Sequence, residues 1–149
     1  MEVKNLFDSQ VKQEIIDRIC KLNSHSPALW GKMNAAQMLA HVQLPFQIAY
    51  GNHRPKGFFF LRFIAPLFKY KLWNNQPYKP GLPTDPTFIM TGIEKNFERE
   101  KTALLELINQ FSPGAIVCET HPIFGKFTKE NWSKSNWKHL DHHLRQFGV

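Results

Sequence analysis

The stretch that most constrains the fold is Trp137-Lys138-His139-Leu140-Asp141-His142-His143-Leu144-Arg145-Gln146-Phe147-Gly148-Val149. His139 and His143 are four residues apart, so on an α-helix both imidazoles leave the same face about one turn apart. Two imidazoles placed in this way can bind one divalent metal, but zinc sites generally use at least three protein ligands. The fold must therefore bring a third ligand to this helix from another part of the chain.

Length and composition predict a single globular domain over residues 1–149. Of the 149 residues 42% are apolar, and 13 Phe and 4 Trp can supply a substantial core. The two cysteines match no paired metal-ligand spacing, and the first residues do not resemble a secretory leader. We therefore expect a cytoplasmic protein with reduced thiols, in which Cys20 is a small buried residue of its helix.

The net charge of +7 comes from 19 basic and 12 acidic side chains. Such a balance favours acidic partners in general, including nucleic acid, anionic lipid and anionic small molecules. The basic residues are scattered and form no continuous run, which is typical of a solvated surface. We therefore do not expect nucleic acid or a membrane surface to be a partner.

The first half of the chain predicts two amphipathic helices. The first covers about residues 8–22, with Asp8 as its N-cap. The second begins near Asn34, which forms a capping-box pattern with Gln37. The inward stripe of this second helix contains Met38, His41, Leu44 and Ile48. A core helix without a site would have an apolar residue such as leucine in place of His41. Pro45 predicts a kink in this helix because its ring crowds the carbonyl of residue 41.

Residues 51–90 predict a long irregular connection, rich in proline and glycine. Connections of this length in a compact domain are usually functional or disordered, and this one is too aromatic for disorder. The apolar run from Phe58 to Trp73 is too short and too interrupted by charge to cross a bilayer, which needs about 20 apolar residues. We expect it to pack over the helices as a lid or crossover.

The second half of the chain predicts two further helices. The third begins near Thr91, with Glu94 completing a capping box, and the last begins after Thr128 or, alternatively, restarts near Ser135. No alternating strand pattern of useful length is present, so the expected fold is all-α. Four amphipathic helices with a long irregular connection between helices 2 and 3 form a four-helix bundle, whose core commonly holds metals. His41 is then the natural third ligand for His139 and His143.

These segments resemble the DinB/YfiT-like superfamily, in an uncharacterised bacterial branch. The likeness rests on an inward histidine in residues 30–41, the His-x-x-x-His pair in residues 138–148, and the preceding His-Pro-x-Phe-Gly segment. The resemblance implies a four-helix bundle that holds one divalent metal, often zinc or nickel, through His41, His139 and His143. It also implies a homodimer and, in some relatives, thiol-dependent transfer or isomerisation with a low-molecular-weight thiol such as bacillithiol or mycothiol.

The resulting hypothesis is a divalent-metal-dependent enzyme that transfers a thiol to a small-molecule substrate. A zinc peptidase pairs its histidine ligands with a glutamate base, and no glutamate occupies that place here. A metal-activated thiol needs no such base. Two alternatives are a metal-dependent hydrolase and a non-catalytic, stress-associated module that binds nucleic acid or a membrane surface.

Four further residues are candidates for supporting roles near the site. Gln37 and Gln146 lie about one turn from a predicted ligand, so either can orient that ligand, and both can equally be surface residues. His142 can replace His139 as a ligand or lie at the rim of the site. His121 can contact substrate, but a loop histidine bonded to backbone is the preferred interpretation. Asp141 points away from the pair, toward a salt bridge or an interface.

Overall fold

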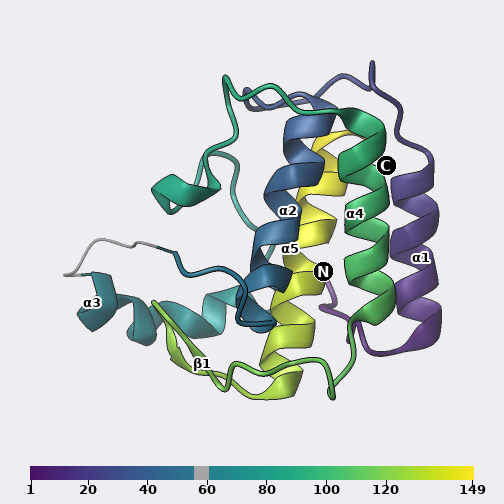
Figure 1. The fold of residues 1–149 in the computed structure, drawn as a ribbon. Helices are drawn as coiled ribbons and strands as arrows, with labels where there is room; N and C mark the ends of the chain where they lie inside the picture. The colour runs from purple at the N-terminus through teal and green to yellow at the C-terminus, as the bar shows by residue number, and fades with distance from the viewer. Residues whose placement is uncertain (56–60) are drawn as a thin grey trace.

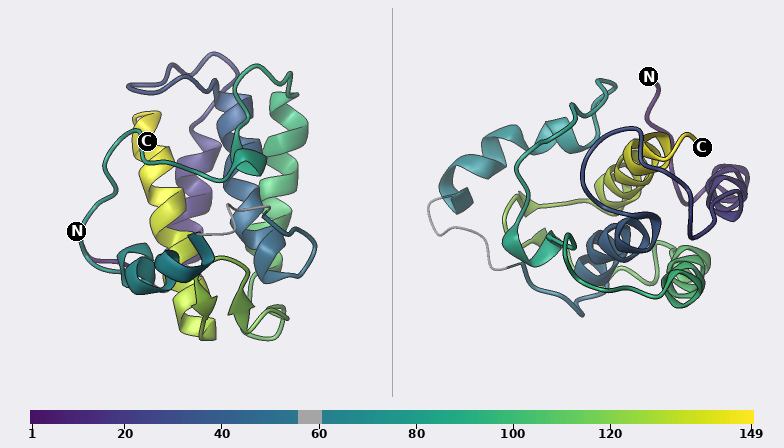
Figure 2. Two further views of the ribbon diagram at one scale, coloured as in Figure 1. Left: turned by 90° about the vertical axis from the view of Figure 1, so that its left-hand side faces the viewer. Right: turned by 90° about the horizontal axis from the view of Figure 1, so that it is seen from above.

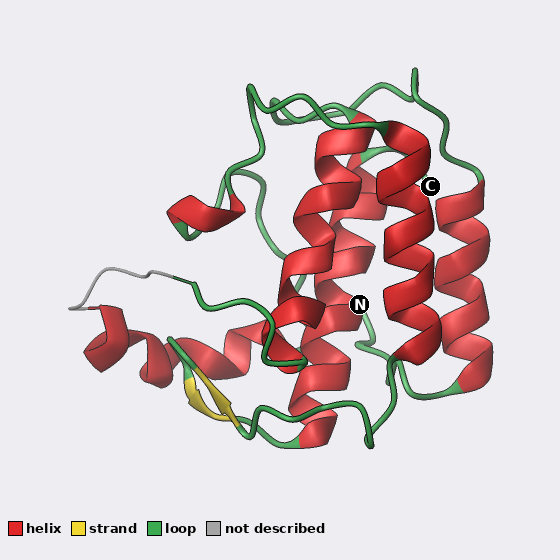
Figure 3. Cartoon of the chain, in the orientation of Figure 1, coloured by secondary structure: helices red, strands yellow, loops and turns green. Residues whose placement is uncertain are grey.

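The computed structural model describes residues 1–55 and 61–149 and is mostly helical (Figure 3). Its elements in chain order are α1 (Ser9–Cys20), α2 (Ala35–Ala49), α3 (Leu61–Phe68), η1 (Lys69–Leu72), η2 (Pro86–Phe88), α4 (Phe97–Gln110), β1 (Thr120–His121), β2 (Gly125–Lys126) and α5 (Lys129–Gln146). The two short strands pair antiparallel as a small hairpin that the sequence did not predict. Within the described residues, no helix is long and apolar enough to span a membrane.

The four longest helices lie side by side around a shared core (Figure 1). Seen from above, α2 neighbours α4 and α5, and α1 closes the other side (Figure 2). Gln43 Nε2 donates to the Glu100 carbonyl over 3.1 Å, and the Tyr50 hydroxyl donates to the Leu107 carbonyl over 2.9 Å. The second contact lies seven residues further along the chain than the first on both helices, so α2 and α4 run parallel. The connection between them must therefore return along the length of the helices, as crossover connections do.

Three predicted helix starts are confirmed by their caps. Asp8 accepts from the backbone of Gln10 and Val11, and Asn34 with Gln37 forms a complete capping box. Thr128 forms a further box with Asn131. The alternative restart at Ser135 is wrong, because its hydroxyl donates within α5 to the Trp132 carbonyl and caps nothing. Helix α2 also continues through Pro45 to Ala49.

The predicted start of the third helix near Thr91 is wrong. Helix α4 begins at Phe97, because the Asn96 side chain accepts from the Arg99 backbone over 3.0 Å. Gly92, which follows the expected cap Thr91, has φ +80°, a left-handed conformation that interrupts a helix at this point. Ile93 consequently lies on the surface and does not belong to the apolar face of α4.

The connection over residues 51–90 is less irregular than the sequence predicts. It contains α3 and two 3₁₀ turns, and Phe58, Phe59 and Phe60 of the expected aromatic lid lie outside the described residues. Only part of the segment covers the helices: η1 packs against α5, whereas α3 projects away from the four helices (Figure 1). The lid expectation therefore fits η1 but not α3.

The core also corrects the prediction for Cys20, whose side chain is exposed. Helix α1 turns Ile15 and Ile19 inward, and Cys20 follows Ile19 by about 100° of helical rotation. The core cluster is completed by apolar side chains from every long helix, among them Met38, Phe46, Leu104, Ile108, Phe111, Trp132, Leu140 and Leu144. Helix α5 also buries several polar side chains, and two of its histidines, His139 and His143, belong to the site described next.

Candidate metal centre

Three histidines from two helices converge between α2 and α5. His41 comes from α2, and His139 and His143 come from successive turns of α5. One ring nitrogen of each lies within 4.8 Å of the other two, and His41 Nε2 is 3.0 Å from His139 Nε2. His41 and His143 are buried, whereas His139 keeps some exposure. The three residues predicted as ligands therefore form a group that can hold a metal ion.

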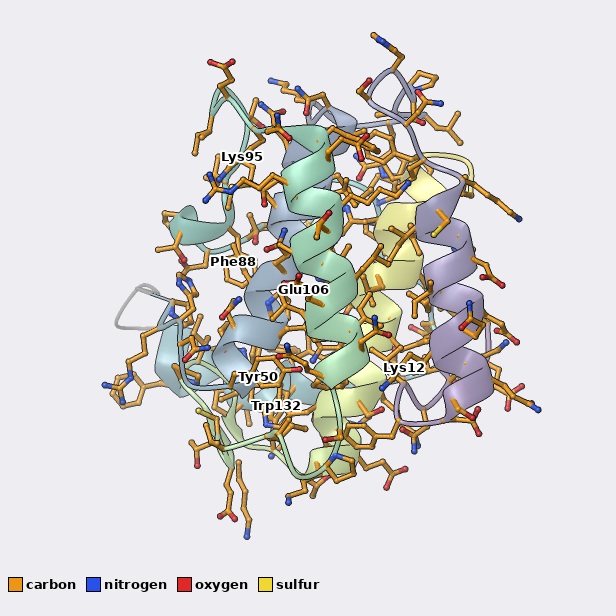
Figure 4. All side chains as sticks on the ribbon, turned by 45° about the vertical axis from the view of Figure 1, so that its right-hand side comes forward. Lys12, Tyr50, Phe88, Lys95, Glu106 and Trp132 are labelled. Atoms are coloured by element: carbon orange, nitrogen blue, oxygen red, sulfur yellow. The ribbon has the colours of Figure 1, made fainter. Side chains whose placement is uncertain are left out.

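The orientation of His41 is fixed by the turn η2. His41 Nδ1 donates to the Phe88 carbonyl over 2.9 Å, and the Phe88 ring packs edge-on against the imidazole at 5.6 Å between centroids. Asp85 caps this turn by accepting from the Thr87 backbone. Figure 4 shows Phe88 beside α2. Because a carbonyl can only accept, Nδ1 carries the proton and the Nε2 lone pair faces His139.

The orientation of His143 is fixed by Gln146. Gln146 Nε2 donates to the Trp30 carbonyl over 2.6 Å, which fixes the direction of the side-chain amide. Its Oε1 therefore accepts from His143 Nδ1, 2.8 Å away. The His143 Nε2 lone pair is left to face the other histidines. Of the two glutamines that the sequence proposed as orienting residues, Gln146 has this role.

Gly31 makes room for Gln146, a role that the sequence did not reveal. Its φ is +83°, and a Cβ at this position would lie 2.5 Å from Gln146 Nε2. The Leu29 backbone N–H also donates to the Gln146 carbonyl over 2.8 Å. The loop before α2 is thereby tied to the last turn of α5. The Trp30-Gly31 pair was visible in the sequence, but only the fold shows what it touches.

Burial keeps the three imidazoles neutral. It lowers the pKa of His41 and lowers that of His143 to about 3. Burial also places the pKa of His139 well below its ordinary value, and the neighbouring histidines lower it further, because a second positive charge beside the first is unfavourable. The neutral imidazole is the form that binds a metal. The group therefore presents unprotonated nitrogens at neutral pH.

The chemistry of the donors fits a late divalent transition metal. Three neutral imidazole nitrogens suit zinc, nickel, copper or iron. Among residues 1–55 and 61–149, the group that could hold a metal consists of the three histidines and includes no carboxylate or thiol as a fourth ligand. Structural zinc usually has four protein ligands, so three histidines leave a coordination position open.

His142 and Asp141 do not join the three-histidine group. The His142 ring lies between Trp30 and Tyr78, at 5.9 and 5.6 Å between ring centroids, and is 4.9 Å from that of His143. It is partly exposed, as expected for a residue at the rim. Asp141 points away and pairs with Arg18 at 2.9 Å, which confirms the predicted salt bridge.

Gln37 and His121 have backbone partners instead of metal-site partners. Gln37 completes its capping box and donates to the Ile93 carbonyl over 3.0 Å. His121 Nδ1 accepts from the backbone N–H groups of Ile123 and Phe124, at 3.1 and 3.3 Å. Its ring stacks on Trp132 at 5.3 Å. His121 is therefore bonded to backbone N–H groups, as the preferred interpretation expects, but it lies in the short strand β1 and not in a loop.

The chain belongs to a family of proteins of unknown function, DUF1569, whose model matches residues 4–148. No curated protein and no solved structure matches the chain. The family description gives no activity, so the function has to be argued from the site.

Proposed function

We propose that the protein is a divalent-metal-dependent enzyme that transfers a low-molecular-weight thiol to an electrophilic small molecule. The single observation that carries this proposal is the convergence of three neutral imidazoles with a coordination position to spare. A divalent metal held by His41, His139 and His143 supplies Lewis acidity that favours the anionic form of a thiol at neutral pH. Zinc and nickel are the metals we propose first.

The surroundings of the three histidines favour thiol transfer over hydrolysis. Metal-dependent hydrolysis commonly uses a carboxylate base beside the ligands. Asp141 is instead paired with Arg18, and Glu130 is paired with Lys134 at 2.6 Å near the opposite end of α5. A thiol is far more acidic than water and needs a weaker base. The site therefore fits a thiol better than a water nucleophile.

His142 is the residue that we propose to move the proton. It lies beside His143, keeps contact with solvent, and is held neutral because burial and the nearby Arg145 charge lower its pKa. A neutral imidazole can accept the thiol proton. The sulfur–carbon bond then forms as the bond to the leaving group breaks, and His142 returns the proton to the leaving group.

The arrangement of α1, α2, α4 and α5 supports a further proposal, that the fold is the four-helix bundle of the DinB/YfiT-like superfamily. The parallel pairing of α2 with α4 and the crossover between them are compatible with such a bundle. A cytoplasmic homodimer belongs to the same proposal.

The first test is metal content by mass spectrometry on untagged protein. We expect about one transition-metal ion per chain in the wild type and almost none in His139→Ala. His25→Ala changes an exposed loop histidine and serves as the matched control. The loaded protein is then assayed for loss of free thiol with an aryl halide, and for hydrolysis of an ester. A wild-type chain that binds no metal after reconstitution overturns the proposal.

A further inference from the structure

The positive charge of this chain is concentrated in one long segment. Residues 18–84 contain nine basic residues and no Asp or Glu, whereas the rest of the chain has ten basic and twelve acidic residues. The net charge of the protein therefore resides in this segment, although its basic residues form no continuous run. The segment includes α3 and η1, which lie at the edge of the molecule (Figures 1 and 2).

Large apolar side chains are exposed together on α3 and η1. Leu67 is 72% exposed and Phe63 is 71% exposed. The other exposed members are Ile64, Phe68 and Tyr70. Positions 63, 64, 67 and 68 recur at helical spacing, so they form one stripe on α3. A soluble domain seldom exposes this much contiguous apolar surface unless the surface meets a partner.

Lysines flank the apolar stripe. Lys71 Nζ lies 5.0 Å from the centroid of the Phe68 ring, and Lys69 Nζ donates to the carbonyl of Lys126 over 3.2 Å. Throughout residues 1–55 and 61–149, neither lysine takes part in an ion pair with a carboxylate. The stripe therefore has cations beside it that are available to an anionic partner.

We propose that α3 and η1 bind the surface of a lipid bilayer that contains anionic lipids. Phe63, Ile64 and Leu67 would enter the boundary between headgroups and acyl chains, while Lys69 and Lys71 remain at the level of the phosphates. A membrane accounts for both the aliphatic and the cationic character of the patch. Single-stranded nucleic acid would use aromatic rings for stacking, for which Ile64 and Leu67 are unsuited. A second copy of the chain would bring like charges together.

The test is sedimentation of the full chain with vesicles of phosphatidylcholine, with or without about one-third phosphatidylglycerol. We expect binding to the anionic vesicles only, weakened at high salt because exposed charges are screened. Ile64→Ser with Leu67→Ser should weaken this binding at least about tenfold, because two apolar side chains no longer leave water. The matched control is Ile93→Ser with Val117→Ser, which changes apolar side chains exposed elsewhere and should bind as the wild type does.

Three results would overturn the membrane proposal. The first is that the protein sediments with neither kind of vesicle at low salt. The second is that the wild type and the Ile64/Leu67 variant are both retained on an immobilised oligonucleotide. The third is that the wild type is a dimer, whereas the Ile64/Leu67 variant is a monomer. Thermal melts of each variant show whether it is folded. His139→Ala should bind vesicles as the wild type does, so the outcome does not depend on the metal site.

Discussion

Two glutamines with the same apparent role in the sequence have different roles in the structure. Gln146 accepts from His143, whereas Gln37 caps α2. We expect Gln146→Leu to weaken metal affinity about 10–100-fold, because His143 loses the acceptor that orients it. Gln37→Leu should cost about 1 kcal/mol of stability and leave metal affinity unchanged. Competition with a chromogenic chelator measures the affinity, and equal affinities in the two variants would contradict this assignment.

The role of Gly31 can be separated from the general strain of a left-handed residue. Gly31→Ala adds a Cβ 2.5 Å from Gln146 Nε2, whereas Gly81→Ala adds one at φ +75° with nothing within 4 Å. Both variants should lose about 1–2 kcal/mol from the backbone conformation alone. Only Gly31→Ala should also weaken metal binding, because it displaces Gln146. Urea unfolding and chelator competition measure the two effects, and a Gly81→Ala protein with the same loss of affinity would refute the explanation.

His121 should make stability depend on pH. Burial lowers its pKa from 6.5 to about 4, so between these values the unfolded chain binds more protons than the folded protein. Stability contributed by His121 is therefore present above pH 6.5 and falls by roughly 3 kcal/mol as the pH drops to about 4. Protonated Nδ1 can no longer accept from Ile123 and Phe124.

His121→Asn is the control for this pH dependence. The asparagine oxygen can accept the same backbone N–H groups but does not titrate. Urea unfolding of both proteins at several pH values should show a steeper acid loss in the wild type. Parallel curves would mean that other histidines account for the whole effect.

At the scale of elements, Lys138 attaches η1 to α5. It is almost fully buried, and its Nζ donates to the carbonyls of Lys71 and Asn74, at 2.6 and 2.9 Å, and to the Asn74 side chain. Its Nζ also lies 4.5 Å from the centroid of the Tyr78 ring. Burial lowers the pKa of Lys138 to about 8. One buried ammonium thus holds much of the segment that the sequence predicted as a lid.

Lys138→Met should release this segment. The change leaves three acceptors without their donor and should cost about 2 kcal/mol or more. Limited proteolysis should then cleave within residues 69–78 faster than in the wild type. Lys134→Met removes only the partly exposed pair with Glu130 and should change stability by less than about 1 kcal/mol. Similar cleavage of both variants would show that Lys138 does not hold the segment.

At the scale of the whole molecule, a metal would join helices that are distant in sequence. His41 on α2 and His139 on α5 are 98 residues apart. A metal that binds only the folded protein raises the free energy of unfolding by about 2.7 kcal/mol when the free metal concentration is one hundred times the dissociation constant. We expect added zinc or nickel to raise the melting temperature of the wild type and not that of His139→Ala. An equal rise in both proteins would place metal binding elsewhere.

Local signals in the sequence predicted most helix starts correctly. Asp8, Asn34 and Thr128 each satisfy backbone N–H groups within three residues, so neighbouring residues suffice to recognise them. The third helix was misplaced because Thr91 and Glu94 match the same local pattern, whereas the actual cap is Asn96. Gly92, directly after Thr91, has φ +80° and interrupts regular structure at the expected start, and the packing of Phe97 in the core favours the later start.

The sequence by itself determined the candidate ligands, because helical periodicity puts His139 and His143 on one face and His41 on an inward stripe. Only the tertiary structure decided how these ligands are held. Gln146, Trp30 and Gly31 meet because a loop before α2 reaches the last turn of α5, and Phe88 reaches His41 through the return of the long connection. Such contacts depend on packing between segments far apart in the chain, and local periodicity carries no information about that packing.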